Sequence, residues 1–221
     1  MTELLKNQIK RFDQRMRLFQ SLNPTSRVLD LGCGEGMNGT KLKAIHPHIQ
    51  LYGVDILPKE RVPAFYSYTE VDLDKGILPF PDSYFDAVVL THVVEHLRSP
   101  LLLGKEINRV MKQGGLVFVE APNWISALVP SFGFHREQHN RFNFYDDPTH
   151  LKPWSKQGIF EFLSHYCGLR VVSVGTVRNW VRVPFDFLVI PFGVLTGNSI
   201  YIVSSFWNLF GWCIYGVGIK E

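Results

Sequence analysis

Residues 27–36 read Arg-Val-Leu-Asp-Leu-Gly-Cys-Gly-Glu-Gly, and this stretch decides the fold class. A short apolar run that contains Asp30 leads into three glycines at alternate positions, Gly32, Gly34 and Gly36, and a helical pattern follows. Glycine lets the chain turn tightly and approach a ligand closely, and the start of a helix offers unpaired N–H groups. The spacing is GxGxG and not the GxGxxG of dinucleotide-binding turns, and Asp30 would repel a pyrophosphate. The stretch therefore predicts a strand, a turn and a helix that together bind a cationic ligand.

Strand and helix patterns alternate on the C-terminal side of this stretch. Apolar runs typical of buried strands lie at residues 27–31, 51–54, 69–71, 85–90, 116–120 and 169–177, and helical patterns lie at residues 38–45, 101–111 and 155–165. On the N-terminal side, residues 1–22 carry apolar residues at helical spacing with basic residues between them, which indicates an amphipathic helix. The alternation predicts an α/β fold, doubly wound and Rossmann-like, with a mostly parallel sheet, helices on both faces and sites at the carboxyl ends of the strands.

The segments after residue 36 keep the order found in one large enzyme family. They are Asp55 with Ile56, residues 71–73, LPFPDSYFDAV at residues 78–88, HVVEHL at residues 92–97, residues 109–115 and residues 121–123. With LDLGCGEG at residues 29–36, these segments make the sequence resemble the class I S-adenosylmethionine-dependent methyltransferases. The nearest branch is the one that modifies small molecules, quinones and glycans. The resemblance runs from residue 27 to about residue 177 and implies a seven-stranded sheet with S-adenosyl-L-methionine as cofactor.

The resemblance also implies which residues hold the cofactor. Asp30 and the glycines would border its amino-acid end, Asp55 would bind the ribose hydroxyls and Ile56 would pack on the adenine; a carboxylate has the acceptors that a vicinal diol needs. The predicted cofactor-binding residues are Asp30, Gly32, Cys33, Gly34, Gly36, Asp55, Ile56, Asp72, Leu73 and Thr91. Two alternatives stay open. In one, Asp30 and Asp55 only cap helices, which leaves the ordered segments unexplained. In the other, the chain is a nicotinamide-dependent oxidoreductase, which the glycine spacing disfavours.

Candidates for the chemistry follow the predicted fourth strand. His92, Glu95 and His96 have spacings of three and four, which place them on one face of a helical turn, and His150 comes from a distant segment. Methyl transfer from a sulfonium mainly requires that the acceptor be oriented and lose its proton, and histidine suits the removal of a hydroxyl proton. His96 and His150, ahead of His92, are the predicted catalytic residues. The same side chains could bind a first-row metal ion, but His92 stands where metal-dependent relatives have an acid, so no metal is predicted.

Charge is unevenly distributed along the chain. Only 19% of the residues are charged, and residues 187–219 contain no charged residue and no histidine. The net charge of +3 comes from residues 1–26, so no basic surface for nucleic acid is expected. The three cysteines are an odd number without paired spacing, and the N-terminus has no apolar signal segment. Both features favour a cytoplasmic location.

The uncharged stretch is interpreted as an insertion at residues 184–211 followed by the last strand at residues 212–220. Such an apolar surface indicates contact with lipid, with a greasy substrate or with another subunit as a homodimer. A single membrane-spanning helix over residues 200–218 is the alternative. Residues 122–154 are too long and too aromatic for an ordinary connection and are predicted to form a lid over the site. The whole of residues 1–221 is expected to form one domain.

Together these patterns predict a cytoplasmic enzyme, in possible contact with a membrane, that methylates a hydroxyl of an apolar, glycan-like or lipid-linked small acceptor. The alternative hypothesis is a catalytically inactive cofactor-binding protein that serves as a membrane or partner adaptor through residues 184–211.

Overall fold

The computed structural model describes residues 14–75, 77–129 and 143–221. Seven strands form a single sheet in the order β3-β2-β1-β4-β5-β7-β6. The strands are β1 Arg27–Leu31, β2 Gln50–Asp55, β3 Ser67–Glu70, β4 Phe85–Thr91, β5 Met111–Pro122, β6 Arg170–Thr176 and β7 Cys213–Ile219. All neighbours pair in parallel except β7, which is antiparallel to both β5 and β6. The predicted seven-stranded, doubly wound α/β fold is therefore confirmed.

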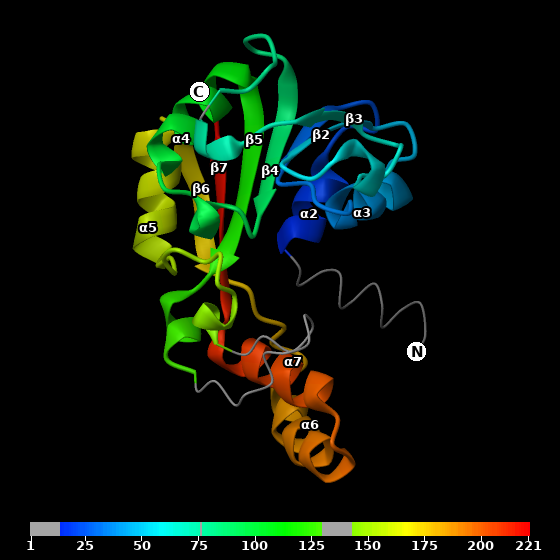
Figure 1. The fold of residues 1–221 in the computed structure, drawn as a ribbon, viewed down its shortest axis with the longest axis vertical. Helices are drawn as coiled ribbons and strands as arrows, with labels where there is room; N and C mark the ends of the chain where they lie inside the picture. The colour runs from blue at the N-terminus through cyan, green and yellow to red at the C-terminus, as the bar shows by residue number, and fades with distance from the viewer. Residues whose placement is uncertain (1–13, 76, 130–142) are drawn as a thin grey trace.

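The helices are α2 Gln14–Ser21, α3 Met37–Ile45, α4 Pro100–Val110, α5 Lys156–Glu161 with a π-helical continuation η6 Phe162–Tyr166, α6 Val183–Thr196 and α7 Ser199–Phe210. Shorter 3₁₀ turns are η1 Lys59–Arg61, η2 Leu73–Lys75, η3 Val94–His96, η4 Trp124–Ala127 and η5 Phe144–Asp146. α2 and α3 lie on one side of the sheet and α4 and α5 on the other (Figure 1). The first part of the predicted N-terminal helix, residues 1–13, lies outside the described residues.

Alternation along β4 explains why both faces of the sheet are covered. Ala87 and Val89 pack into the cluster under α2 and α3, and Val88 and Leu90 pack into the cluster under α4 and the α5–η6 segment. All four side chains are fully buried, as expected where successive side chains of a strand point to opposite faces. The strand order reverses between β1 and β4, and in such sheets ligands bind at the carboxyl ends of the strands beside that reversal.

Two elements differ from those predicted. Met111 begins β5 instead of ending the preceding helix, because it pairs with Phe85 beside an irregularity in the β4–β5 register. The helix after Ser155 starts as expected, with the Ser155 hydroxyl accepting from the Gly158 N–H at 3.0 Å, but its second half is π-helical. The predicted last strand forms as β7.

The apolar insertion is more regular than its prolines and glycines suggested. Pro191 lies inside α6, and Gly193 is buried where α6 meets α7. A Cβ on Gly193 would lie 2.9 Å from Ile202 Cγ1, so this glycine allows the two helices to approach closely. Residues 183–210, α6 and α7, are called the apolar hairpin below. Within the described residues, no helix is long and apolar enough to span a membrane, which contradicts the alternative of a spanning helix over residues 200–218.

Candidate functional site

The glycine loop after β1 is held against the end of β2. The N–H groups of Gly32 and Cys33 donate to the Val54 carbonyl oxygen at 2.7 and 3.1 Å. Gly32, Gly34 and Gly36 all have positive φ, of 68°, 49° and 84°, and Gly36 is the N-cap of α3. Side chains other than glycine rarely adopt this conformation, which explains three glycines at alternate positions.

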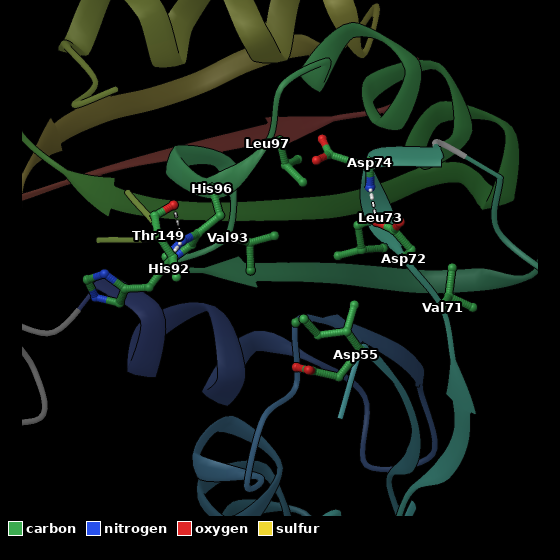
Figure 2. A pocket seen from close by; sticks show the side chains of 12 residues that line it. Asp55, Val71, Asp72, Leu73, Asp74, His92, Val93, His96, Leu97 and Thr149 are labelled. Carbon is green, nitrogen blue, oxygen red and sulfur yellow. Dashed lines mark hydrogen bonds between the residues drawn. The ribbon is translucent and has the colours of Figure 1, made fainter. Parts of the chain in front are cut away.

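A cavity of about 420 Å³ opens beside this loop, at the point where the strand order reverses (Figure 2). Its size is in the range of small-molecule and cofactor sites. Its walls come from the ends of β2, β3 and β4 and from the segment after η5; the lining residues are Gly32, Asp55, Ile56, Val71, Asp72, Leu73, Asp74, His92, Val93, His96, Leu97 and Thr149.

Asp55 at the end of β2 links the glycine loop to the cavity. Its Oδ2 accepts from the Gly34 N–H at 2.8 Å and its Oδ1 accepts from the Leu57 N–H at 3.1 Å. Each carboxylate oxygen retains a second acceptor position. Beside it, Ile56 lines the cavity with 69% of its surface exposed, although it is apolar. An exposed aliphatic group next to a fixed carboxylate suits a ligand with a flat apolar ring and a diol.

Asp30 takes a different position from the one its sequence context favours. The carboxylate is fully buried and accepts from the Tyr66 hydroxyl at 2.5 Å and from the Asn38 amide at 3.1 Å. Burial raises its pKa to about 6, against the opposing effect of these two hydrogen bonds. In this structure Asp30 therefore supports the loop from beneath and is not among the cavity-lining residues.

Two more predicted cofactor residues lie close to the loop without lining the cavity. Cys33 is buried, and burial raises the pKa of its thiol to about 12. The Thr91 hydroxyl accepts from the Asn38 amide at 2.8 Å. Their roles in cofactor binding stay predictions, as does that of Asp30.

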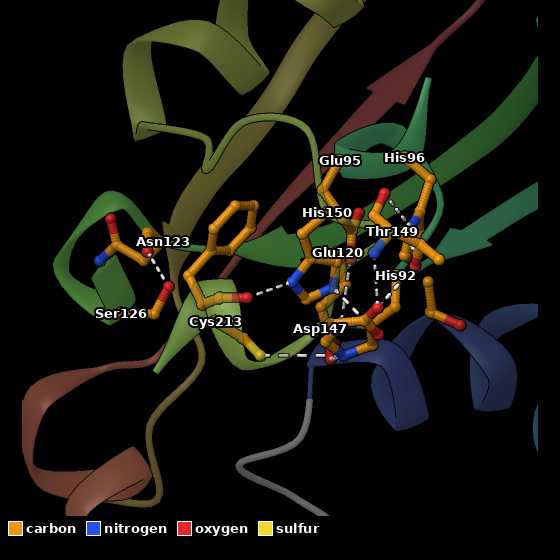
Figure 3. Close-up of polar contacts among 12 residues, drawn as sticks. His92, Glu95, His96, Glu120, Asn123, Ser126, Asp147, Thr149, His150 and Cys213 are labelled. Carbon is orange, nitrogen blue, oxygen red and sulfur yellow. Dashed lines mark hydrogen bonds and ion pairs between the residues drawn. The ribbon is translucent and has the colours of Figure 1, made fainter. Parts of the chain in front are cut away.

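His92 lies between two carboxylates at the ends of β4 and β5 (Figure 3). Its Nδ1 is 3.3 Å from Glu95 Oε1, and its Nε2 is 3.6 Å from Glu120 Oε1 and 3.9 Å from Cys213 Sγ. Desolvation disfavours the imidazolium, but Cys213, Glu120 and Glu95 favour it more strongly, so the pKa of His92 is raised well above its usual value. A histidine that is protonated at neutral pH is a poor proton acceptor.

His96 and His150 come together although they lie far apart in the sequence. Their ring centroids are 4.8 Å apart. His96 Nδ1 lies 3.1 Å from both the carbonyl oxygen and the hydroxyl of Thr149, so an Nδ1–H tautomer leaves its Nε2 free. His150 stacks on Phe144, and its Nδ1 lies 2.6 Å from the Phe144 carbonyl oxygen. Desolvation lowers the pKa of His150 below its usual value, against the effect of this hydrogen bond.

The two ends of the predicted lid, residues 122–154, meet each other, and its last part lies against η3. Asn123 pairs with Trp154, and the Leu151 N–H donates to the Glu95 carbonyl oxygen at 2.9 Å. These contacts bring Thr149 and His150 beside η3. Residues 130–142 of the predicted lid lie outside the described residues.

Among the residues that the structure describes, two groups of side chains have metal-ligand atoms within 4.8 Å of one another. One is His92, Glu120 and Cys213, and the other is Glu95, His96 and His150. The absence of a metal in the working protein stays a prediction.

Sequence reasoning missed several residues of this site. Asp74, Val93 and Leu97 line the cavity, and each is within two residues of a predicted site residue, so proximity in the sequence was the available signal. Glu120 and Cys213 carried no such signal, because their positions depend on pairing between distant strands: β4–β5 pairing places Glu120 beside the end of β4, and β5–β7 pairing brings Cys213 to His92.

Comparison with known proteins agrees with this architecture. A family model described as a methyltransferase domain matches residues 3–174. The chain belongs to the class I S-adenosylmethionine-dependent methyltransferases. A solved S-adenosylmethionine-dependent methyltransferase from Archaeoglobus fulgidus superimposes on this methyltransferase with a TM-score of 0.62 and 24% sequence identity. The alignment covers 99% of this chain and 94% of that chain, so the two share the whole fold.

Curated sequence relatives align over a shorter range. A probable S-adenosylmethionine-dependent methyltransferase from Mycobacterium tuberculosis is 32% identical over 119 residues, which cover 52% of this methyltransferase and 43% of the relative. A malonyl-[acyl-carrier protein] O-methyltransferase from Legionella pneumophila is 31% identical over 109 residues, which cover 45% of this chain and 38% of the relative. The chain spans less than half of the length of these relatives.

Proposed function

We propose that this methyltransferase transfers the methyl group of S-adenosyl-L-methionine to a hydroxyl of an apolar, glycan-like or lipid-linked small acceptor. The observation that carries the proposal is the cavity at the strand-order reversal, walled by Asp55, Ile56 and the positive-φ glycine loop and bordered by His96. One curated relative is by name an O-methyltransferase, which favours a hydroxyl or carboxyl oxygen over nitrogen as the acceptor atom.

The residues present fit the cofactor. The Asp55 carboxylate is fixed by two backbone N–H groups and keeps acceptor capacity for the ribose hydroxyls, while Ile56 and Leu73 offer apolar surface for the adenine. Gly32 has no room for a side chain, because a Cβ would lie 2.4 Å from Val93 Cγ2. When bound, S-adenosyl-L-methionine supplies a methyl group that an oriented nucleophile can displace in line.

The protein itself supplies the group that accepts the proton of the acceptor hydroxyl. His96 lines the cavity, and its Nδ1 is occupied by Thr149, so Nε2 is the atom that can take the acceptor's proton. His150, neutral and 4.8 Å away between ring centroids, can hold the same proton or orient the His96 ring. His92, with its raised pKa, instead places a positive charge between Glu95 and Glu120.

Calorimetry with S-adenosyl-L-methionine tests the cofactor site. Asp55→Ala should weaken binding by about 10- to 100-fold, the effect of losing hydrogen bonds to a charged group. Glu161→Ala, an exposed acid on α5 outside the cavity, is the matched control and should bind as the wild type does. Absence of binding by the wild type would refute the proposal.

Transfer assays with labelled methyl donor then test the base. In a panel of hydroxyl-bearing lipids and glycans, His96→Gln should lower turnover by about 100-fold or more while cofactor affinity stays unchanged. If His96→Gln and His150→Gln both turn over as fast as the wild type, the assigned roles are contradicted.

The second candidate is an inactive adaptor, favoured by the exposed apolar hairpin. A protein that binds the cofactor and the membrane but methylates nothing in the panel would fit it. We propose a cytoplasmic location for both candidates, which the odd number of cysteines without paired spacing supports.

A further inference from the structure

The apolar hairpin is a self-contained unit that projects from the end of the sheet (Figure 1). Its two helices pack directly, with the rings of Phe192 and Tyr201 6.0 Å apart. The turn between them is closed by the Asn198 N–H, which donates to the Gly193 carbonyl oxygen at 2.9 Å, and the Asn198 side chain caps α7. The turn at the tip is therefore closed by hydrogen bonds within the hairpin itself.

Large apolar side chains cover the outside of this hairpin. The exposed ones are Phe185, Phe187, Leu188, Phe192, Val194, Leu195, Ile200, Tyr201 and Phe210. On α6 they are spread, at 100° per residue, over about half of the helix circumference, and the other half faces α7. Leu195 is 86% exposed and Leu188 is 71% exposed. A helix that is apolar all round is normally surrounded by protein or by lipid.

Charge is absent from the tip of the hairpin and concentrated at its base. Residues 187–210 contain no charged side chain. Asp186, the one acid of the two helices, is fully buried and bound to Arg182 Nε at 2.7 Å, and Asn208 also donates to it. The hairpin thus presents no negative charge to its surroundings.

The base of the hairpin combines a cation with an exposed tryptophan. The guanidinium of Arg178 lies 4.8 Å from the ring centroid of Trp180, whose exposure is 64%. Arg178 also donates to the Asn208 and Leu209 carbonyl oxygens at the end of α7. Arg15, from α2, lines the same small cavity as Arg178 and Trp180, next to the buried Glu120. From tip to base, the hairpin presents apolar side chains and then a tryptophan with arginines. A membrane leaflet has the matching order, with acyl chains inside and anionic headgroups at its surface.

The hairpin starts and ends beside the candidate active site. It follows β6, whose Thr176 pairs with Ile214 of β7, and β7 begins at Cys213, 3.9 Å from His92. The Asn123 N–H, at the end of β5, donates to the Trp212 carbonyl oxygen at 2.7 Å. Whatever surrounds the hairpin therefore also adjoins the edge of the sheet that carries the histidines.

We propose that the apolar hairpin inserts into one leaflet of a membrane and that the methyltransferase takes a lipid-linked acceptor from that surface. α6 has 14 residues and is about 21 Å long, shorter than the roughly 30 Å apolar core of a bilayer, so the hairpin enters without crossing. A second copy of the chain is the competing occupant, but exposed apolar groups on the outer sides of both helices suit a fluid surrounding better than one flat interface. The membrane contact stands on the hairpin alone, and only the choice of acceptor rests on the proposed function.

Vesicle flotation with the full-length protein tests the membrane contact. The probes are phosphatidylcholine vesicles with and without phosphatidylglycerol. The wild type should float with both and more completely with the anionic lipid. Leu195→Glu should lower the vesicle partition coefficient at least tenfold. Ile77→Glu is the matched control, since Ile77 is 73% exposed and precedes β4, at the opposite edge of the sheet from the hairpin, and it should float as the wild type does.

Two further measurements separate the outcomes. Calorimetry with S-adenosyl-L-methionine should give the same affinity for all three proteins, so a cofactor-binding failure reports on the proposed function and not on the hairpin. Light scattering after gel filtration gives the oligomeric state. The inference is overturned if the wild type does not float, if Leu195→Glu floats equally well, or if the wild type is a dimer that Leu195→Glu converts to a non-floating monomer.

Discussion

Gly32→Ala should be markedly more destabilising than Gly34→Ala, although both glycines have positive φ in the same loop. A Cβ at residue 32 would lie 2.4 Å from Val93 Cγ2, whereas a Cβ at residue 34 would have no neighbour within 4 Å. The left-handed conformation itself costs about 1–2 kcal/mol for a residue with a side chain, and this applies to both variants. The overlap with Val93 adds about 1–3 kcal/mol at residue 32 alone, the usual cost of overpacking.

Equilibrium unfolding in urea measures these differences. We expect a loss of about 2–5 kcal/mol in the free energy of unfolding for Gly32→Ala and about 1–2 kcal/mol for Gly34→Ala. Val93→Ala removes the methyl group that the new Cβ meets, so the Gly32→Ala/Val93→Ala protein should be more stable than the sum of the single changes predicts, by about 1–3 kcal/mol. Equal losses for the two glycine variants, or strict additivity in the double variant, would show that Val93 does not constrain the loop.

Three further predictions concern the protonation, the accessibility and the ion pairing of individual side chains. Because the folded pKa of Asp30 is about 6 and its unfolded value is 3.8, protonation favours folding; this stabilisation is complete below the unfolded pKa and is lost as pH rises through 6. The free energy of unfolding of the wild type relative to Asp30→Asn should thus rise by about 2–3 kcal/mol between pH 7.5 and pH 4, and a pH-independent difference in urea melts would contradict the assignment. Cys33 and Cys167, whose thiol pKa values are raised by burial, should not react with a chromogenic disulfide at pH 8 until the protein unfolds; rapid labelling of either in the native protein would argue against their burial. Arg182→Ala should lower the free energy of unfolding by about 2–3 kcal/mol, less than for a wholly buried pair because Arg182 is half-exposed, and adding Asp186→Asn should recover part of the loss; thermal melts that leave Arg182→Ala at the wild-type value would refute this.

The parts of the fold that the sequence predicted are those with short-range signals. The glycines at 32, 34 and 36 each take a positive φ, and Asp55 lies at the end of β2, where its place after the second apolar run put it. The alternation of strands and helices was equally local, since each apolar run could be interpreted on its own. The helical pattern that starts at residue 155 was equally local, and the Ser155 side chain caps the helix that forms there.

The parts that could not be predicted depend on contacts between distant segments. Asp30 appears in the sequence as a ligand-facing acid, but Tyr66, 36 residues later, binds its carboxylate beneath the loop. Glu120 meets His92 because β5 pairs with β4, and Cys213 meets it because β7 runs antiparallel beside β5. Proline and glycine disfavour the interior of a helix, yet Pro191 is tolerated within α6 and Gly193 makes the close contact with α7 possible.

The pairing of Thr176 with Ile214 also means that β6 and β7 are the two arms of an ordinary β-hairpin whose connection has been replaced by two helices. The entropic cost of closing a connection grows only with the logarithm of its length, so a long connection between neighbouring strands is tolerated. We therefore expect that the segment between β6 and β7 can be replaced as one unit. A tight two-residue turn in its place should leave the sheet intact, and the same helices grafted between the corresponding strands of another enzyme of this fold should carry their surface preference with them.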